Sequence, residues 1–226
     1  KVYPSIEFQL FIIYKHKYMN YLSKKGYDLI PTRFLKVNTT ISKNIQYIRN
    51  FIDKENCSEL IMKPELAGFA SGFKRFKYLT DLKFTKYLQS MKKLNYQTIL
   101  VQPYIDEFLQ YWEIKTYWLD GKFTYAYGTK VGLEYDDAIP ESQGGILDDK
   151  LILQCRKIGE KIILTIEKDF GKQIQLRIDF GCCINNDDIC RKYFVNEIEC
   201  CPTISDDETI KPNFKLLSQS IINRVK

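Results

Sequence analysis

Two neighbouring stretches near the C-terminus alternate apolar with charged residues, and this alternation restricts the fold most strongly. QIQLRIDFGCCI (173–184) and KYFVNEIEC (192–200) have the two-residue period of half-buried strands, and a short polar segment joins them. Because residues two apart in a strand point to the same face, each strand has an apolar side and a charged side. We therefore predict a sheet that buries one face and presents charges on the other.

Three carboxylates in these strands are predicted to converge. By strict alternation, Glu197 and Glu199 share a face, and Asn196 lies on the opposite one. If the strands pair with their charged sides together, Asp179 joins both glutamates. Three carboxylates suit a hard cation such as Mg²⁺, which commonly bridges carboxylates to phosphate oxygens. A solvated sheet face balanced by Arg177 and nearby lysines explains the pattern equally well, so both interpretations stay open.

The remaining sequence mixes helical and extended patterns and contains no internal repeat. Helical spacing predicts helices at 8–26, 42–55, 81–94 and 148–169, with another in the tail beyond 210. Extended patterns predict strands at 28–37, 59–64 and 98–105, and a hairpin at 112–131 that turns at Asp120-Gly121. Glycine, proline and small residues predict loops at 66–73 and 132–147. This mixture indicates an α+β fold instead of a regular βαβ array.

Composition and charge exclude several classes of protein. The chain has 226 residues, 45% of them hydrophobic and 14% aromatic, which argues against disorder. No apolar stretch approaches the roughly 20 residues that cross a bilayer, and no signal peptide is visible. We therefore expect a cytoplasmic protein without a membrane partner. The net charge of +6 comes from scattered lysines, which fit a nucleotide as well as a nucleic acid.

Cysteines gather near the last two strands, at Cys182, Cys183, Cys190, Cys200 and Cys201. A zinc site and a set of buried thiols are the two interpretations of this cluster. The spacing lacks a paired Cys-x-x-Cys motif, and adjacent residues of a strand point to opposite faces. We expect reduced thiols that pack in the interior.

A lysine late in the predicted strand 59–64 is the second feature with chemical content. Lys63 precedes the small-residue loop PELAGFASG. A lysine there can hold a phosphate as a point charge while loop N–H groups surround its oxygens. The segment is not a Walker A motif, because Lys63 precedes the glycines instead of following them. A lysine with no ligand at a strand end is the simpler alternative.

In this order, the segments resemble the ATP-grasp superfamily of ligases, most closely its glutathione-synthetase-like branch, over about residues 3–205. The resemblance rests on YPSIEFQLFIIYKHKYMNYLSKKGYDLIPT, IMKPELAGFASG, LVQPYI, WEIKTYWLDGK and the pair LRIDFG and VNEIECCPT. It implies an α+β ATP-grasp fold with two lobes, the nucleotide between them, and a preceding domain that is largely missing. Residues 1–36 would be the remnant of that domain with a first helix, 37–104 the small lobe, and 105–226 the large lobe with the metal site.

The resemblance implies a set of ATP-binding residues. Lys17 and Lys63 would contact phosphates, and Glu113 would bind the ribose. The backbone of residues 102–104 would face the adenine edge, with Ile105 packed on the ring. The full implied set is Lys17, Lys63, Gly68, Ser71, Gly72, Gln102, Pro103, Tyr104, Ile105 and Glu113. The single histidine, His16, is expected to be a helix-surface residue.

The resemblance also implies metal ligands and catalytic cations. Asp179, Glu197 and Glu199 would bind Mg²⁺, or Mn²⁺ in its place, although Glu199 stands where the family usually has Asn. Arg177, Lys115 and Lys130 would contact phosphate or an acyl-phosphate. The implied function is an ATP-dependent, Mg²⁺-dependent ligase that joins a carboxylate to an amine or thiol. Its partners would be small-molecule or peptide carboxylates and amines, and a homo-oligomer is compatible with the sequence.

Two other functions stay open at this level. The chain could be a catalytically degenerate ATP-grasp protein that serves as a nucleotide-binding or interaction scaffold. It could also be a basic nucleic-acid module, which we consider the weakest of the three. ATP consumption distinguishes a ligase from a nucleotide-binding scaffold. Steep salt dependence of RNA or DNA binding would identify a nucleic-acid module.

Overall fold

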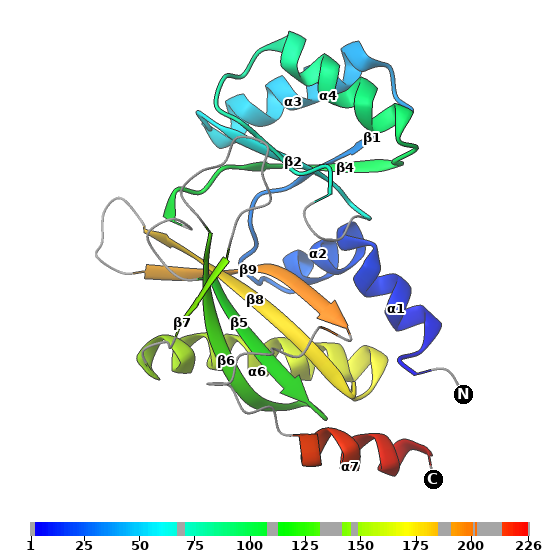
Figure 1. Cartoon of the computed structure of the whole chain (residues 1–226), viewed down its shortest axis with the longest axis vertical. Coiled ribbons are helices and arrows are strands. Elements are labelled where there is room, and N and C mark those ends of the chain that lie inside the picture. Colours follow the sequence, from blue (N-terminus) through cyan, green and yellow to red (C-terminus); the bar gives the residue numbers. More distant parts are fainter. Residues whose placement is uncertain are drawn as a thin grey trace.

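Two antiparallel sheets form the protein, which confirms the predicted α+β class (Figure 1). A computed structural model describes residues 3–66, 71–107, 113–131, 142–145, 149–184, 191–200, 202 and 214–225. The smaller sheet has the strand order β1-β4-β2-β3, and the larger sheet has the order β7-β6-β5-β8-β9. In Figure 1 the smaller sheet lies above the larger one, and the N-terminal helices lie beside β9.

The N-terminal region contains two helices where the sequence predicts one at 8–26. Helix α1 spans Ile6–Ile13, and its N-cap Ser5 accepts a hydrogen bond from the backbone N–H of Phe8. Tyr14 has φ −81° and ψ 90°, which leaves the helical region, and α2 starts again at Lys15–Lys24. The prediction of one continuous helix is therefore wrong. Because of the break, α2 has an N-terminus of its own, where Lys15 and His16 are half-buried.

The smaller sheet carries two helices on one face. Its strands are β1 (Arg33–Lys36), β2 (Leu60–Pro64), β3 (Lys74–Phe76) and β4 (Thr98–Pro103), and its helices are α3 (Ile41–Glu55) and α4 (Asp81–Lys93). Buried side chains such as Leu60, Met62 and Phe84 join helices and sheet into one core. Helix α3 begins one residue before the predicted 42–55, with Thr40 as its N-cap residue, and β3 lies in a segment for which no strand is predicted.

The larger sheet is built around the predicted hairpin. Its strands are β5 (Glu113–Leu119), β6 (Lys122–Val131), β7 (Ser142–Gly145), β8 (Gln175–Ile184) and β9 (Arg191–Cys200), followed by α7 (Phe214–Val225). Asp120 and Gly121 form the turn with φ values of 51° and 73°, as the Asp-Gly pair predicts. β7 lies inside the segment predicted as a loop, since Ser142–Gly145 pairs with β6.

One face of the larger sheet packs on α6 (Asp149–Phe170), and the other carries charge. Thr116 and Trp118 of β5 lie opposite Ile178 and Leu176 of β8, and all four are buried. The intervening Lys115 of β5 lies opposite Asp179 of β8 on the second face. Strand alternation thus separates the core of the large lobe from a charged surface that faces away from α6.

A β-bulge corrects one part of the predicted alternation. Asp179 pairs with Glu197, but the next residue, Phe180, pairs with Val195, so Asn196 is the extra residue of β9. Val195 is buried in the core, and the side chain of Asn196 donates to Glu113 on the charged side. The prediction that Asn196 and Glu197 point to opposite faces of the sheet is therefore wrong, because the bulge shifts the alternation by one residue.

The two sheets have separate hydrophobic cores. The first core joins α1, α2 and α6 to the larger sheet, and the second joins α3 and α4 to the smaller one. β1 lies within the segment 1–36 but pairs with β4 of the smaller sheet. The division of the chain at residues 36 and 104 stays a prediction. In the part of the chain that the structure describes, every helix is too short or too polar to span a membrane.

The contact between α6 and Trp118 yields a prediction about stability. A Cβ atom added at Gly159 would lie 2.3 Å from Cζ2 of the buried Trp118 ring. Although alanine usually stabilises a helix relative to glycine, overpacking a core costs about 1–3 kcal/mol. We expect Gly159→Ala to lower the free energy of unfolding by about 1 kcal/mol or more in urea denaturation.

Gln154→Ala on the exposed side of α6 is the matched control and is expected to change the free energy of unfolding by less than about 0.5 kcal/mol. A Gly159→Ala protein more stable than the parent would show that the ring moves aside at no cost.

Candidate functional site

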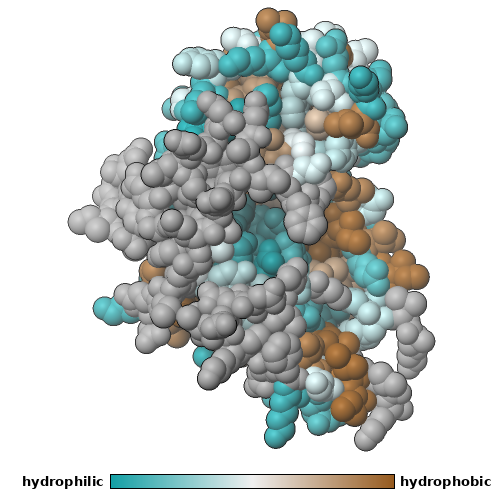
Figure 2. Space-filling view, viewed as in Figure 1, coloured by the Kyte–Doolittle hydropathy of each residue, from teal (hydrophilic) through white to brown (hydrophobic). Residues whose placement is uncertain are grey.

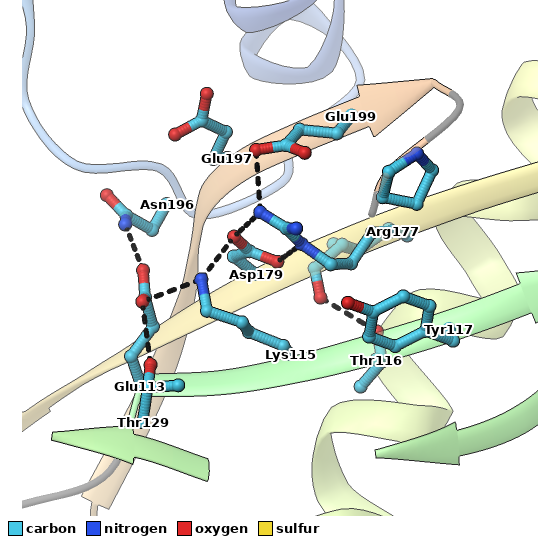
Figure 3. Close-up of polar contacts among 12 residues, drawn as sticks. Glu113, Lys115, Thr116, Tyr117, Thr129, Arg177, Asp179, Asn196, Glu197 and Glu199 are labelled. Atoms are coloured by element: carbon cyan, nitrogen blue, oxygen red, sulfur yellow. Dashed lines mark hydrogen bonds and ion pairs between the residues drawn. The ribbon is translucent and has the colours of Figure 1, made fainter. Parts of the chain in front are cut away.

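The charged face of the larger sheet lies at a recess between the two sheets. Figure 2 shows hydrophilic side chains within this recess. Figure 3 shows acidic and basic side chains of β5, β8 and β9 pointing toward one another across the same face. We call Glu113, Lys115, Arg177, Asp179, Glu197 and Glu199 the charged cluster. Every member had been selected from the sequence.

Asp179 is the most deeply buried member of the cluster, with 2% of its side chain exposed. Its Oδ2 atom lies 2.9 Å from Nζ of Lys115. Its two carboxylate oxygens also lie 2.7 and 2.9 Å from Nε and Nη2 of Arg177. Strand pairing places Lys115 opposite Asp179, and Arg177, two residues before Asp179 on β8, lies on the same face by strand alternation.

Glu113 is held from three sides. Its Oε2 atom lies 2.9 Å from Nζ of Lys115 and accepts a hydrogen bond of 3.2 Å from the Thr129 hydroxyl. Its Oε1 atom accepts a hydrogen bond of 2.6 Å from the amide of Asn196. Neither Thr129 nor Asn196 had been selected from the sequence. The bulge in β9 is the reason for missing Asn196, since strict alternation turns its side chain away.

The two glutamates of β9 contact different cations. Glu199 accepts a hydrogen bond of 2.6 Å from Nη2 of Arg177, which connects it to Asp179. Glu197 lies opposite Asp179 in the strand register and forms an ion pair with Lys15 at the start of α2. Lys15 is not among the residues selected from the sequence, because no local pattern indicates that a helix begins at this residue.

The environment lowers the pKa values of Asp179 and Glu197 and raises that of Glu199. Burial opposes ionisation of Asp179, but Lys115 and Arg177 outweigh it and hold the pKa of Asp179 below its usual value. Lys15 and Lys63 likewise overcome burial and lower the pKa of Glu197. For Glu199, burial raises the pKa, and the neighbouring Asp179 and Glu197 add to the effect against Arg177.

The pKa values of the two cations, Lys115 and Arg177, are both shifted toward the charged form. Burial disfavours the charged form of Lys115, but Asp179 and Glu113 more than compensate and raise its pKa. The pKa of Arg177 is raised because Asp179 and Glu199 outweigh burial. Both side chains are therefore cationic at neutral pH. A cluster of this kind, with strongly shifted pKa values in a recess, is typical of a functional site.

Lys63 extends from β2 of the smaller sheet toward this cluster. Burial and the nearby Lys15 lower the pKa of Lys63, whereas Glu197 and Glu113 oppose the shift. The structure thus brings Lys63 and Lys15 together from different parts of the chain. Among the described residues, Lys63 has no carboxylate within 4.0 Å.

Lys17 lies elsewhere on α2. It is exposed, and its Nζ atom lies 5.1 Å from the centroid of the Tyr14 ring. Lys15 is two residues earlier, and side chains two apart on a helix point in different directions. The phosphate-binding role of Lys17 stays a prediction.

The predicted adenine-binding segment lies at the end of β4. The side chain of the buried Gln102 donates a hydrogen bond of 2.9 Å to the Thr32 hydroxyl, and Pro103 has no N–H. The backbone N–H of Tyr104 donates to the carbonyl of Glu59 at 3.0 Å, so this N–H has a partner within the protein. Ile105 is half-buried and packs against the core of the larger sheet.

The predicted phosphate-covering loop is described in part. Ser71 Oγ lies 3.2 Å from the Tyr96 hydroxyl, and the carbonyl of Gly72 accepts from the Tyr87 hydroxyl at 2.7 Å. Gly72 has φ +72°, and a Cβ atom there would lie 2.7 Å from Cγ of Pro64, so the position requires glycine. Gly68 and the side chain of Lys130 lie outside the described residues.

The donor set for a divalent cation consists of carboxylates that contact protein cations. Asp179, Glu197 and Glu199 share one sheet face, as predicted. Within the described ranges, no three His, Cys, Asp or Glu residues lie close enough together to hold a metal. The oxygen donors are of the kind that Mg²⁺ prefers. Mg²⁺ binding by these residues stays a prediction. Of the cysteines near the last two strands whose burial is described, Cys182 is buried in the core, as expected, whereas Cys200 is half-buried.

The comparisons with known proteins bear on the fold. No protein-family model and no curated protein sequence matches the chain. Among solved structures, D-cycloserine synthetase superposes with a TM-score of 0.71 at 16% identity over 93% of this chain and 69% of its own. D-alanyl-alanine synthetase A from Vibrio cholerae gives 0.68 at 13% identity, over 94% of this chain and 65% of its own.

A third neighbour is the ATP-grasp ligase PsnB, solved with minimal precursor, Mg and ADP. It gives a TM-score of 0.61 at 13% identity and covers all of this chain and 63% of its own. The chain has the ATP-grasp fold. It spans about two thirds of the length of these three ATP-grasp structures. At these identities the likeness shows the ATP-grasp fold alone, and the glutathione-synthetase-like branch is not distinguished.

The bridging position of Lys115 yields a second prediction. Lys115→Met would leave Asp179 and Glu113 without a shared cation, and breaking a buried ion pair costs about 3 kcal/mol. We expect a loss of this size in the free energy of unfolding at neutral pH, measured by chemical denaturation.

Arg49→Met provides the control, since Arg49 pairs with Asp81 at 2.8 Å on the exposed surface. It is expected to cost less than about 1 kcal/mol. Equal losses in the two variants would mean that the charged cluster is solvated like the surface.

Proposed function

We propose that the protein is an ATP-dependent and Mg²⁺-dependent ligase that joins a carboxylate to an amine or thiol through an acyl-phosphate. The observation that carries the proposal is the buried set of alternating charges on the inner face of the larger sheet. Buried ion pairs contribute little net stability, so a network of this size argues for a ligand that uses the same charges. The ATP-grasp fold of the chain supports this ligand being a nucleotide.

In this proposal the phosphates of ATP interact with Lys63 and Lys15. Both cations lie near Glu197, and Lys63 reaches the site from the opposite sheet. Lys17, exposed on the same helix as Lys15, would contact phosphate as well, as the resemblance implies. Glu113 would bind the ribose, and residues 102–105 with Gly68, Ser71 and Gly72 would surround the base and phosphates.

Mg²⁺ would be held by Asp179, Glu197 and Glu199. Because each carboxylate contacts a cation of the protein, a bound triphosphate supplies alternative partners for those cations and frees carboxylate oxygens for the metal. The metal would offset the charge that builds on the transferred phosphate. Mn²⁺ would occupy the same ligands.

Arg177, Lys115 and Lys130 would hold the acyl-phosphate. Arg177 and Lys115 are kept cationic by the cluster, as such a role requires. The protein would act mainly by positioning the reactants and neutralising charge. The neighbouring structures include one of PsnB with a precursor peptide, which supports peptide or small-molecule carboxylates and amines as substrates.

Nucleotide binding tests the site. We expect Lys63→Ala and Lys15→Ala each to weaken ATP binding about tenfold or more in calorimetry with Mg²⁺, because each loses a charged phosphate contact. Lys24→Ala, at the exposed C-terminal end of the same helix, is the control, with an affinity within about twofold of the parent. Glu197→Ala is expected to abolish the Mg²⁺-dependent part of ATP binding. Unchanged affinity in the Lys63 and Glu197 variants would refute the assignment.

Turnover tests the activity. With mixtures of carboxylates and amines, we expect ADP and phosphate to form only when both kinds of substrate are present. ATP binding without turnover under any mixture would favour the alternative of a nucleotide-binding scaffold. The sequence alone had left that alternative open, and no contact in the cluster specifically favours it.

A further inference from the structure

The N-terminus of helix α2 is capped by a residue at the end of a strand of the smaller sheet. Its N-cap residue, Tyr14, makes no side-chain capping hydrogen bond. Instead, the backbone N–H of His16 donates a hydrogen bond of 2.9 Å to the carboxylate of Glu65. Glu65 directly follows β2 of the smaller sheet and is only 3% exposed. A carboxylate at a helix N-terminus satisfies a free N–H and interacts favourably with the helix dipole.

The His16 side chain binds the same oxygen. Nδ1 of His16 lies 2.6 Å from Oε1 of Glu65, and with the carboxylate as acceptor the ring must carry a proton on Nδ1. The ring also has its centroid 5.9 Å from that of Phe34 in β1, in an edge-on arrangement. His16 therefore contacts the smaller sheet through two residues. His16 lies in α2 with 34% of its side chain exposed, as expected of a helix-surface residue, but it also has these specific partners.

In the sequence, His16 and Glu65 are close to Lys15 and Lys63, the two lysines proposed to bind the phosphates of ATP. Lys15 immediately precedes His16, and Lys63 is two residues before Glu65. Lys15 reaches Glu197 of the larger sheet, and the charges of Lys15 and Glu197 both act on Lys63. The only covalent path between the two lysines runs through β1 and α3, so their separation depends on contacts between the segments.

We propose that Glu65 and His16 are positioning residues that hold Lys15 and Lys63 at the separation required by the phosphates of the nucleotide. This inference rests on the proposed function, because it assumes that the two lysines bind ATP. An aspartate or serine at position 14 could have capped α2 locally. Capping from the distant Glu65 instead fixes the start of α2 to the end of β2.

The test compares ATP with adenosine, which lacks phosphates. We expect Glu65→Gln and His16→Ala to weaken binding of Mg²⁺-ATP about tenfold, while adenosine affinity stays within about twofold. A general loss of structure would weaken both ligands equally. Calorimetry measures both affinities, and thermal unfolding of each variant reports its stability. Glu55→Gln, in α3 of the same lobe, is the matched control and should leave the ratio of affinities unchanged.

A conservative variant gives an independent readout. His16→Asn keeps an N–H donor near the position of Nδ1, so we expect it to recover most of the ATP affinity that His16→Ala loses. This comparison remains decisive if Glu65→Gln folds poorly. The inference is overturned if His16→Ala and His16→Asn bind ATP alike, or if ATP and adenosine weaken together. If the parent protein does not bind ATP, the proposed function fails as well, and the parent measurement alone shows this.

Discussion

The arrangement of the site depends on Asp179, a carboxylate held between Lys115 and Arg177 on the inner face of the larger sheet. Removing this charge from water would be costly without two cations at hydrogen-bonding distance. The pairing of β5 with β8 brings Lys115 to Asp179, and the alternation of β8 puts Arg177 on the same face, so the charge balance follows from the strand structure. Glu113 and Glu199 extend the network to either side.

The net stability that a buried ion-pair network contributes is too small to explain why these charges are present. Replacing buried ion pairs with apolar residues is often neutral or stabilising, so the sequence retains these charges for another reason. Each carboxylate contacts a cation that could also bind phosphate, and each cation contacts a carboxylate that could also bind metal. Under the proposed function, such a site would exchange its internal partners for an anionic nucleotide and a divalent cation without a large change in local net charge.

The break at Tyr14 connects this sheet to the smaller lobe. It starts a second helix whose first residues, Lys15 and His16, contact Glu197 in one sheet and Glu65 in the other. One turn of helix thus touches both halves of the recess. The bulge in β9 has a comparable effect, because it rotates Asn196 onto the charged side to support Glu113. Both are local irregularities, and both place polar groups at the site.

The sequence by itself determined the α+β class, the hairpin at Asp120-Gly121 and the charged face of the C-terminal strands. These follow from local periodicity and turn chemistry, which act over a few residues. The membership of Lys15, Thr129, Asn196 and Glu65 in the site was decided only by the tertiary structure. Their positions depend on a helix break, a bulge and contacts between distant segments. No pattern of neighbouring residues encodes these features, because the partners that stabilise them lie far away in the chain.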